Sequence, residues 1–205
     1  MFRTMVGKTI IAGMVPFFWA MADEIQKADN SLSLAEGESW VGGTAPGSGD
    51  VAVWDGEIAQ PGGWNCGLGA SVAWGGLRVT NAVSMLTVTN SGATLSLGGD
   101  GINLAAATNE YFCRLYAPVN VLGDQVWRVS SPTVLYLWGP VSGAGALTAG
   151  TDVQKGHVVF YDAVDLPKGV TVAGNAQMRT NAVVSGPVTV ASGGEIGRAS
   201  CRGRV

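Results

Sequence analysis

From Trp40 onward, apolar and polar residues alternate in short runs separated by glycine. This period of two is typical of strands that bury one face, because successive side chains of a strand point to opposite sides of the sheet. The clearest runs are LRVTN (77–81), LTVTN (86–90), TLSLGG (94–99), INLAA (102–106), VWRV (126–129), TVLYLWG (133–139), HVVFY (157–161), GVTVAG (169–174) and PVTVASGG (187–194). The pattern predicts an all-β protein of many short strands joined by tight turns.

Two of these runs, 77–81 and 86–90, are near copies that start nine residues apart. Neighbouring strands of similar sequence are typical of the stacked turns of a solenoid. In such a stack Asn81 and Asn90 would lie at equivalent strand ends, where their amides could hydrogen-bond along the axis. The helical segments that parallel α/β folds need between strands are missing. We therefore expect a β-solenoid, and a β-sandwich is the alternative.

The N-terminal segment, 1–22, has the three parts of a secretory signal peptide. Arg3 and Lys8 supply positive charge, residues 10–19 are apolar, and 20–22 (Ala-Met-Ala) have the small-x-small pattern of a cleavage site. The apolar run is shorter than the roughly 20 residues that a transmembrane helix needs. We predict a signal helix, cleavage after Ala22, export to the cell surface or medium, and no membrane span in the mature part. A buried or uncleaved N-terminal helix is the alternative.

The chain as a whole divides into five predicted parts. They are a signal peptide (1–22), a polar lead-in (23–38), a tryptophan-rich cap (39–76), solenoid turns (77–195) and a basic tail (196–205). A cap is expected because an uncovered solenoid end leaves an unpaired strand edge that promotes aggregation. We expect the turns to be interrupted near residue 195, so that the chain is an N-terminal fragment. Self-association through that interrupted end follows as a prediction.

Two segments resemble a known family. SWVGGTAPGSGDVAVWDG (39–56) is similar to the Trp-x-Gly-Gly-x-x-Pro-x-x-x-Asp segment that opens many bacterial proteins with autotransporter-associated β-strand repeats. DQVWRVSSPTVLYLWGPVSGAGALTAG (124–150) resembles the repeat itself, with Gln-x-Trp followed by Val-Ser-Gly-x-Gly-x-Leu. The resemblance covers about residues 39–194 and departs at 148–156, where TAGTDVQKG replaces the usual Lys-x-Gly-x-Gly. It implies a right-handed β-helix on a large, exported protein displayed at the outer membrane or cell surface.

The last ten residues, IGRASCRGRV (196–205), have a composition unlike the rest of the chain. They resemble the forward-frame translation of a common sequencing adapter and differ from it only at Gly203. We interpret 196–205 as a non-native tail, which should be left out of fold reasoning. The alternative is a genuine basic tail that binds anionic lipid or polysaccharide.

Composition excludes some classes of protein. Hydrophobic residues make up 47% of the chain and charged residues only 13%, with 31 glycines. Disordered chains have the opposite balance, so a folded chain is expected. Basic residues do not cluster with interleaved aromatics, which argues against nucleic acid as a partner. Without the signal peptide and the tail, the mature part is moderately acidic, as is common for soluble secreted proteins.

Two cysteines, Cys66 and Cys113, lie outside the tail, and Cys201 lies within it. An even pair in an exported chain is compatible with one disulfide bond. Two buried, unpaired thiols are the alternative, because the distance between Cys66 and Cys113 cannot be read from the sequence.

Candidate catalytic residues are few. His157 is the only histidine; it opens a strand, and no serine or cysteine stands in a nucleophile motif. Asp162 and Asp165, with Lys168 nearby, could serve polysaccharide hydrolysis, which needs two facing carboxyl groups. A second acidic group has the same interpretation: Asp50, Asp55 and Glu57. Both groups are more simply explained as turn residues, because aspartate stabilises turn backbones.

We therefore expect no enzyme activity, no cofactor and no metal site. GGDG (98–101) resembles a calcium-binding solenoid turn, but it occurs as a single copy, and a plain turn is the preferred interpretation.

Aromatic residues offer the remaining candidate site. Trp54, Trp64 and Trp74 recur every ten residues. On an exposed face they could stack on sugar rings, whereas in the interior they would fill the cap or core, which is the interpretation we favour. We expect packing roles as well for Tyr111, Phe112, Tyr116 and Trp127.

The predicted function is that of a non-catalytic, exported β-helix passenger for surface display or adhesion. The alternative is a β-helix that binds or degrades polysaccharide, with cell-surface glycans as partners. Fold alone does not choose between the two, because function depends on the site that a fold presents.

Overall fold

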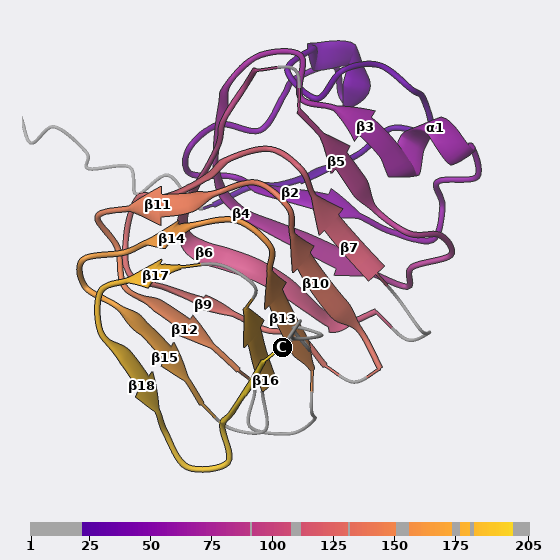
Figure 1. Ribbon diagram of the computed structural model, residues 1–205. Coiled ribbons are helices and arrows are strands. Elements are labelled where there is room, and N and C mark those ends of the chain that lie inside the picture. Colours follow the sequence, from indigo (N-terminus) through magenta and orange to yellow (C-terminus); the bar gives the residue numbers. More distant parts are fainter. Residues whose placement is uncertain are drawn as a thin grey trace, which may run out of the picture.

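The computed structural model describes residues 22–90, 92–107, 112–130, 132–150, 156–173, 177–180 and 183–198. Within these ranges the chain coils into a β-solenoid of about six turns with almost no helix (Figure 1). All named strands pair in parallel, which confirms the predicted solenoid and excludes the antiparallel sandwich. The predicted signal helix, apart from Ala22, and residues 199–205 of the predicted tail lie outside the described residues.

Three parallel sheets form the sides of the solenoid. Sheet 1 contains, in order, β1 (Glu24–Gln26), β2 (Val51–Trp54), β4 (Val72–Thr80), β6 (Leu95–Ala106), β8 (Val119–Val121), β11 (Val141–Gly143), β14 (Val164–Asp165) and β17 (Val184–Ser185). Sheet 2 contains β3 (Asn65–Gly67), β5 (Thr87–Thr89), β7 (Phe112–Leu115), β10 (Val134–Leu137), β13 (His157–Phe160), β16 (Gln177–Thr180) and β19 (Glu195–Arg198). Sheet 3 contains β9 (Gln125–Trp127), β12 (Leu147–Ala149), β15 (Val170–Val172) and β18 (Val188–Val190).

The repeating unit of the solenoid is a whole turn of three strands. β7, β8 and β9 form one such turn, and β10, β11 and β12 form the next. Residues in register are therefore one turn apart: Val134 pairs with Phe112 of the preceding turn and with His157 of the following turn. Two short helical segments lie near the start of the chain, a 3-10 helix (Gly37–Ser39) and α1 (Pro61–Trp64).

The two near-copy runs do not stack on each other, so this part of the sequence prediction is wrong. The run 77–81 belongs mostly to β4 in sheet 1, whereas 86–90 contains β5 in sheet 2. Asn81 and Asn90 therefore lie on different sides of the solenoid and form no ladder. Asn90 instead accepts hydrogen bonds at Oδ1 from the N–H groups of Gly92 (2.7 Å) and Ala93 (3.0 Å), which is a local Asx turn.

The segment GGDG (98–101) lies inside a strand and is not the turn that the sequence suggested. The runs 94–99 and 102–106 merge into the long strand β6. Trp74 of β4 pairs with Leu97, but Gly76 pairs with Gly101, so β6 holds two extra residues at an irregularity in the pairing. A Cβ on Gly76 would lie 2.7 Å from the Cβ of Asp100. The segment thus lets two strands approach closely, and the resemblance to a calcium-binding turn is not supported.

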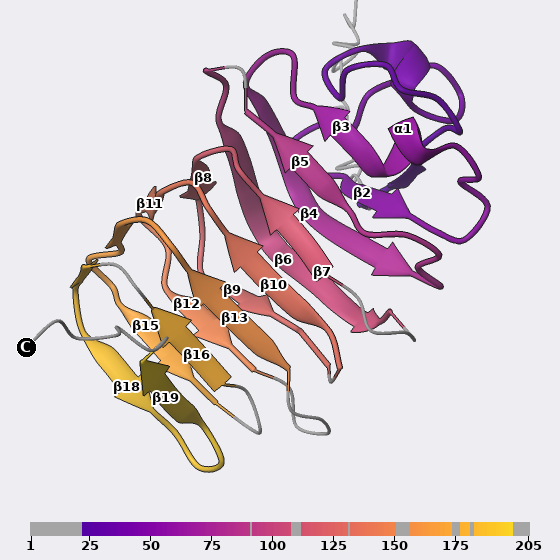
Figure 2. The ribbon, with the colours of Figure 1, turned by 45° about the vertical axis from the view of Figure 1, so that its right-hand side comes forward.

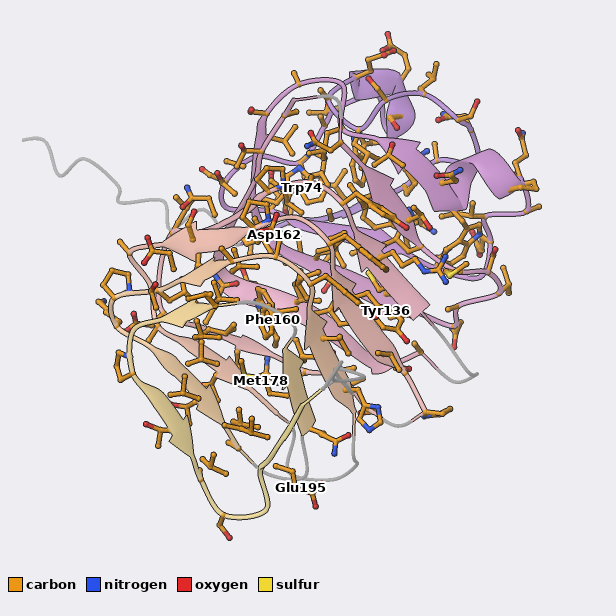
Figure 3. The ribbon with its side chains drawn as sticks, viewed as in Figure 1. Trp74, Tyr136, Phe160, Asp162, Met178 and Glu195 are labelled. Atoms are coloured by element: carbon orange, nitrogen blue, oxygen red, sulfur yellow. The ribbon has the colours of Figure 1, made fainter. Side chains whose placement is uncertain are left out.

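The core fills the inside of the coil. Along β13 the inward Val158 and Phe160 are buried, and Met178 occupies the position of Val158 in the next turn. Figure 3 shows Phe160 and Met178 lying between the sheets. Columns of inward side chains from successive turns pack on one another in this way, and the burial of their apolar surface holds the turns together.

The N-terminal end of the solenoid is closed by residues 27–41, which we call the closed end. The N–H of Val41 donates to the carbonyl of Gln26 (2.8 Å), along the outer edge of β1. The N–H of Leu34 donates to the carbonyl of Gly67 (2.9 Å), along the outer edge of β3. Leu34 and Trp40 are themselves buried, so this segment covers both strand edges and core.

The opposite end consists of β17, β18 and β19, which we call the open end. Each is the last strand of its sheet among the described residues, and Figure 2 shows β18 and β19 at the yellow extremity of the stack. Val188 and Val190 are 40% and 50% exposed, whereas Val170 and Val172, one turn earlier, are 1% and 0% exposed. The same inward positions are therefore buried in the middle of the solenoid and exposed here.

Candidate functional site

An exposed row of aromatic side chains crosses three successive turns. Tyr116, Trp138 and Tyr161 each follow directly after a strand of sheet 2 (β7, β10 and β13), and they occupy equivalent positions. The Tyr116 and Trp138 ring centroids are 5.7 Å apart with an interplanar angle of 11°, and those of Trp138 and Tyr161 are 3.8 Å apart at 1°. Tyr116 and Trp138 are 39% and 40% exposed, so this row is the clearest aromatic feature of the described surface.

The geometry of the aromatic row limits what it can bind. Neighbouring strands lie about 4.8 Å apart, so equivalent rings of successive turns stack face to face. Both faces of Trp138 are directed at tyrosine rings, and only its edge remains for solvent. A sugar ring stacks on an aromatic face, so it could use the ends of the row but not its middle. Each stacked pair contributes about 0.5–1.5 kcal/mol to the cohesion of the turns.

The surface next to the row adds one more ring and one cation. Tyr136 on β10 is labelled in Figure 3. Its ring centroid lies 6.0 Å from that of Tyr161, with 38° between the ring planes. Tyr136 is in register with Arg114 of the preceding turn. The patch therefore combines aromatic edges and phenol hydroxyls with a guanidinium on the outer face of sheet 2.

The tryptophans proposed for glycan stacking lie inside the first turns. Trp54, Trp64 and Trp74 are all buried. The Trp54 and Trp74 rings each pack edge-on against Trp40, with centroids 5.4 Å and 5.6 Å away. The Nε1 of Trp54 donates to the carbonyl of Gly63 at 3.1 Å. The glycan-stacking interpretation is wrong, because a buried indole offers no face to a sugar; these rings fill the core, as the favoured alternative stated.

The two cysteines do not form a disulfide bond. Cys66 and Cys113 are free and buried. Cys66 lies on β3 and Cys113 on β7, with β5 between them in sheet 2. Strands separated by one intervening strand are about 9.5 Å apart, beyond the roughly 7 Å between Cα atoms that a disulfide can bridge. The disulfide prediction is thus wrong, and the alternative of two buried thiols describes the structure.

Burial also makes both thiols unreactive at neutral pH. It raises the pKa of Cys66 to about 11, and the nearby Lys27 only partly opposes this. Burial raises the pKa of the fully enclosed Cys113 further still. The thiolate is the reactive form of cysteine, so these side chains are inert at neutral pH.

Of the two acidic residues in 162–168, Asp162 behaves as a turn residue, whereas Asp165 lies on a strand. Asp162 accepts a hydrogen bond at Oδ1 from the N–H of Ala163 (2.7 Å). Asp165 is exposed on β14. The Nζ of Lys168 lies 2.9 Å from Oδ1 of Asp124. Asp124 directly precedes β9, which lies two solenoid turns before the strand that follows Lys168, β15. The N–H of Ala146 and then the ammonium of Lys168 lower the pKa of Asp124.

In the second acidic group (Asp50, Asp55 and Glu57), both aspartates accept hydrogen bonds from nearby backbone N–H groups. Asp50 accepts at Oδ2 from the N–H of Gly47 (2.7 Å). Asp55 accepts from the N–H of Glu57 (3.0 Å) and from Nε2 of Gln26. Glu57 itself is exposed. These contacts match the turn interpretation of the group and bring no two carboxylates to a common centre.

The remaining candidate, His157, opens β13 and is half-buried, in register with Val134. Among the described residues, no group of three or more histidine, cysteine, aspartate or glutamate side chains could hold a metal ion. In the same ranges, no helix is long and apolar enough to cross a membrane.

A buried lysine at the closed end was missed from the sequence. Lys27 is 1% exposed, and its Nζ donates to the carbonyls of Ala28 (2.8 Å) and Asn30 (2.9 Å) and to Oδ1 of Asn30 (3.0 Å). Burial lowers the pKa of Lys27, against the raising effects of Cys66 and Asp29. The ammonium holds the loop that starts the closed end. A lysine in a polar lead-in carries no local signal of such burial.

The aromatic row was missed as well, although a signal existed. Tyr116, Trp138 and Tyr161 recur at the spacing of one turn. A search for aromatics at that spacing would have found them.

No protein-family model, curated protein or solved structure matches the chain. The structure defines its class, a parallel β-solenoid, and the resemblance to autotransporter-associated repeats stays a prediction.

Proposed function

We propose that the chain is a non-catalytic, exported β-solenoid that acts as a structural or display element at the cell surface. The observation that supports this most directly is the stacking of equivalent three-strand turns, seen from β7 to β15. Each turn packs on its neighbours and extends the molecule by about 4.8 Å, so length is added without a new fold. Such a rod spaces or presents whatever it is attached to.

Export is the part of this proposal that is easiest to test. β1 begins at Glu24, just after Ala22, so cleavage at the predicted site would leave every strand of the solenoid in place. In a bacterial host, N-terminal sequencing of secreted or periplasmic protein should find Asp23 first. A20R/A22R should block this processing. Full-length, unprocessed protein confined to the cytoplasm would overturn the export proposal.

The aromatic row favours a second candidate function, polysaccharide binding. The exposed ring edges, the phenol hydroxyls and Arg114 lie together on sheet 2. A glycan array probed with the chain and with Y116A/Y161A tests this candidate. Binding that the variant abolishes supports it, whereas an array without signal, or a signal that Y116A/Y161A leaves unchanged, overturns it.

The proposal also includes a foreign origin for residues 196–205 and kinship with proteins that carry autotransporter-associated repeats. Sequencing genomic DNA across codon 195 tests both. A reading frame that continues into further glycine-rich turns supports them. A genomic IGRASCRGRV followed by a stop codon overturns the foreign origin and brings the anionic-ligand alternative forward.

A further inference from the structure

We propose that Asp50 binds the α-ammonium group that cleavage after Ala22 creates on Asp23, and that this ion pair fastens the first strand of the mature solenoid. The inference rests on the proposed cleavage and extends it, because it gives the new N-terminus a partner within the chain. It follows from the position of the Asp23 nitrogen and from the contacts that hold both residues.

The first observation is a contact between Asp23 and Asp50. The backbone nitrogen of Asp23 lies 3.4 Å from Oδ1 of Asp50. In the uncleaved chain this nitrogen belongs to a neutral peptide group. Hydrolysis of the peptide bond between Ala22 and Asp23 leaves a carboxylate on Ala22 and an amine on Asp23, which is protonated below its ordinary pKa of about 7.7–8.0. The same nitrogen then carries a positive charge opposite an existing carboxylate.

The second observation is that the Asp50 side chain is already held in place. Asp50 is half-buried, and its Oδ2 accepts from the N–H of Gly47 (2.7 Å), while Oδ1 is the atom next to Asp23. The carbonyl of Asp50 accepts from the N–H of Gly75 on β4 (2.7 Å). Surface ion pairs contribute little partly because they must order two mobile side chains. Here one partner is ordered by other contacts and the other is backbone.

The third observation is that Asp23 is held as well. Its carbonyl accepts from the N–H of Val51 (2.8 Å), at the point where β1 begins to pair with β2. The new ammonium therefore stays near Asp50 unless the start of β1 detaches. An ion pair at this position strengthens the attachment of β1 to β2 only once the preceding segment has been removed.

The charges around this position favour a cation. Glu24 is paired with Arg78, and the side chain of Asp23 adds a further carboxylate. Asp100 lies close by, since a Cβ on Gly75 would be 3.0 Å from its Oδ2. The α-amine should therefore have a raised pKa in the folded chain. A raised pKa stabilises the fold below the ordinary value of about 7.7–8.0, and this contribution is lost as pH rises through the folded value.

The test uses the chain from Asp23 to Val205, released from a carrier by a protease that leaves Asp23 first, with circular dichroism against the full chain as the check on structure. Reaction of the α-amine with limiting acetic anhydride over a series of pH values, followed by mass spectrometry, gives its pKa. D50N keeps an acceptor for Gly47 but removes the charge, and it should lower this pKa by about half a unit. E57Q removes an exposed charge elsewhere and should leave the pKa unchanged.

A second measurement needs no substitution. Acetylation of Asp23 keeps its N–H but removes the positive charge. At about pH 7 the free amine should raise the Tm by about 1–3 °C over the acetylated chain. The difference should disappear near pH 10, where the amine is neutral, and shrink in high salt, which screens exposed charges.

Two results would overturn the binding of the amine by Asp50: a pKa that D50N leaves unchanged, and a Tm at neutral pH that acetylation leaves unchanged. If D50N fails to fold, the acetylated chain decides. Unprocessed protein in the export test would overturn the proposal differently, by removing the source of the amine. Because the test chain is cut by an added protease, the two failures are distinguishable.

Discussion

The two ends of the solenoid solve the same problem differently. Among the described residues, no further solenoid turn lies beyond either end, so the outer strand edges and the last interior layer need another cover there. At the closed end, residues 27–41 fold back over the solenoid: the N–H groups of Val41 and Leu34 donate to the edges of β1 and β3, and Leu34 and Trp40 are buried. At the open end, Val188 and Val190 stay exposed. A turn thus supplies only half of its own burial, and its stability depends on what lies beyond it.

The largest expected effect comes from emptying the core near the closed end. Trp54 is buried against Trp40 and donates a hydrogen bond to Gly63. W54A should lower the free energy of unfolding by about 3–5 kcal/mol, because it removes this packing and leaves a cavity. V190A at the open end should lower it by less than about 1 kcal/mol. Urea unfolding followed by circular dichroism measures both, and equal losses would contradict the comparison.

The second effect depends on pH and on the buried thiols near the closed end. Burial raises the pKa of Cys66 from 9.0 to about 11, and that of Cys113 as well. The stability that protonated thiols provide is complete below pH 9, where the unfolded thiol still holds its proton, and is lost as pH rises toward 11. For Cys66 the loss is about 2–3 kcal/mol.

The control for this pH dependence is C66A/C113A. Because the pKa of Lys27 is lowered, its contribution to the free energy of unfolding increases as pH rises, which opposes the effect of the thiols. Because Cys66 itself raises the pKa of Lys27, C113A, which leaves the contact between Cys66 and Lys27 intact, serves as a second control that isolates one thiol. Urea midpoints should converge for the chain and C66A/C113A between pH 9 and 11; a constant difference would show that the thiols do not titrate as expected.

A third, intermediate effect belongs to the middle turns, which are covered on both sides. A Cβ on Gly145 would press into the carbonyl oxygen of Gly123 in the preceding turn, whereas a Cβ on Gly123 would meet no atom within 4 Å. G145A should cost about 1–3 kcal/mol, because the two turns must separate. G123A should be neutral within about 0.5 kcal/mol. Thermal unfolding of the two variants distinguishes contact between turns from a general effect of losing glycine.

The smallest effect is expected for an exposed ion pair between turns. Lys168 and Asp124 are largely exposed at the surface, and such pairs contribute little because water and salt screen them. K168M should leave the urea midpoint unchanged within error. A clear loss of stability would mean that surface charges, and not only buried layers, hold successive turns together.

The positions of most strands could be predicted from the sequence, because the alternation of apolar and polar residues is a local property. The run 157–161 became β13 and 169–174 became β15 for this reason. The stacking partners could not be predicted. LRVTN and LTVTN look alike because both are strands ending in Thr-Asn, yet only tertiary contacts decide which strand lies next to which.

The candidate site was harder to predict than the fold. The regular spacing of Trp54, Trp64 and Trp74 suggested a shared face, but these residues belong to β2, α1 and β4, and their burial comes from the coil closing around them. Lys27 shows the reverse case, a polar residue enclosed by a loop that folds back over it. Burial of this kind depends on the whole path of the chain, so it cannot be predicted from the residues that are adjacent in the sequence.

The stacked aromatic row has an optical consequence. Trp138 lies on the surface, whereas five other tryptophans are enclosed: Trp40, Trp54, Trp64, Trp74 and Trp127. A dissolved quencher should therefore reduce the fluorescence of Trp138 before that of the enclosed tryptophans. The Trp138 indole is 3.8 Å from the ring of Tyr161 in the next turn. Pulling the rod along its axis would part these rings and alter both their near-ultraviolet circular dichroism and the quenching of Trp138. A change in axial extension would therefore be detectable from the protein's own aromatic residues, without any added dye.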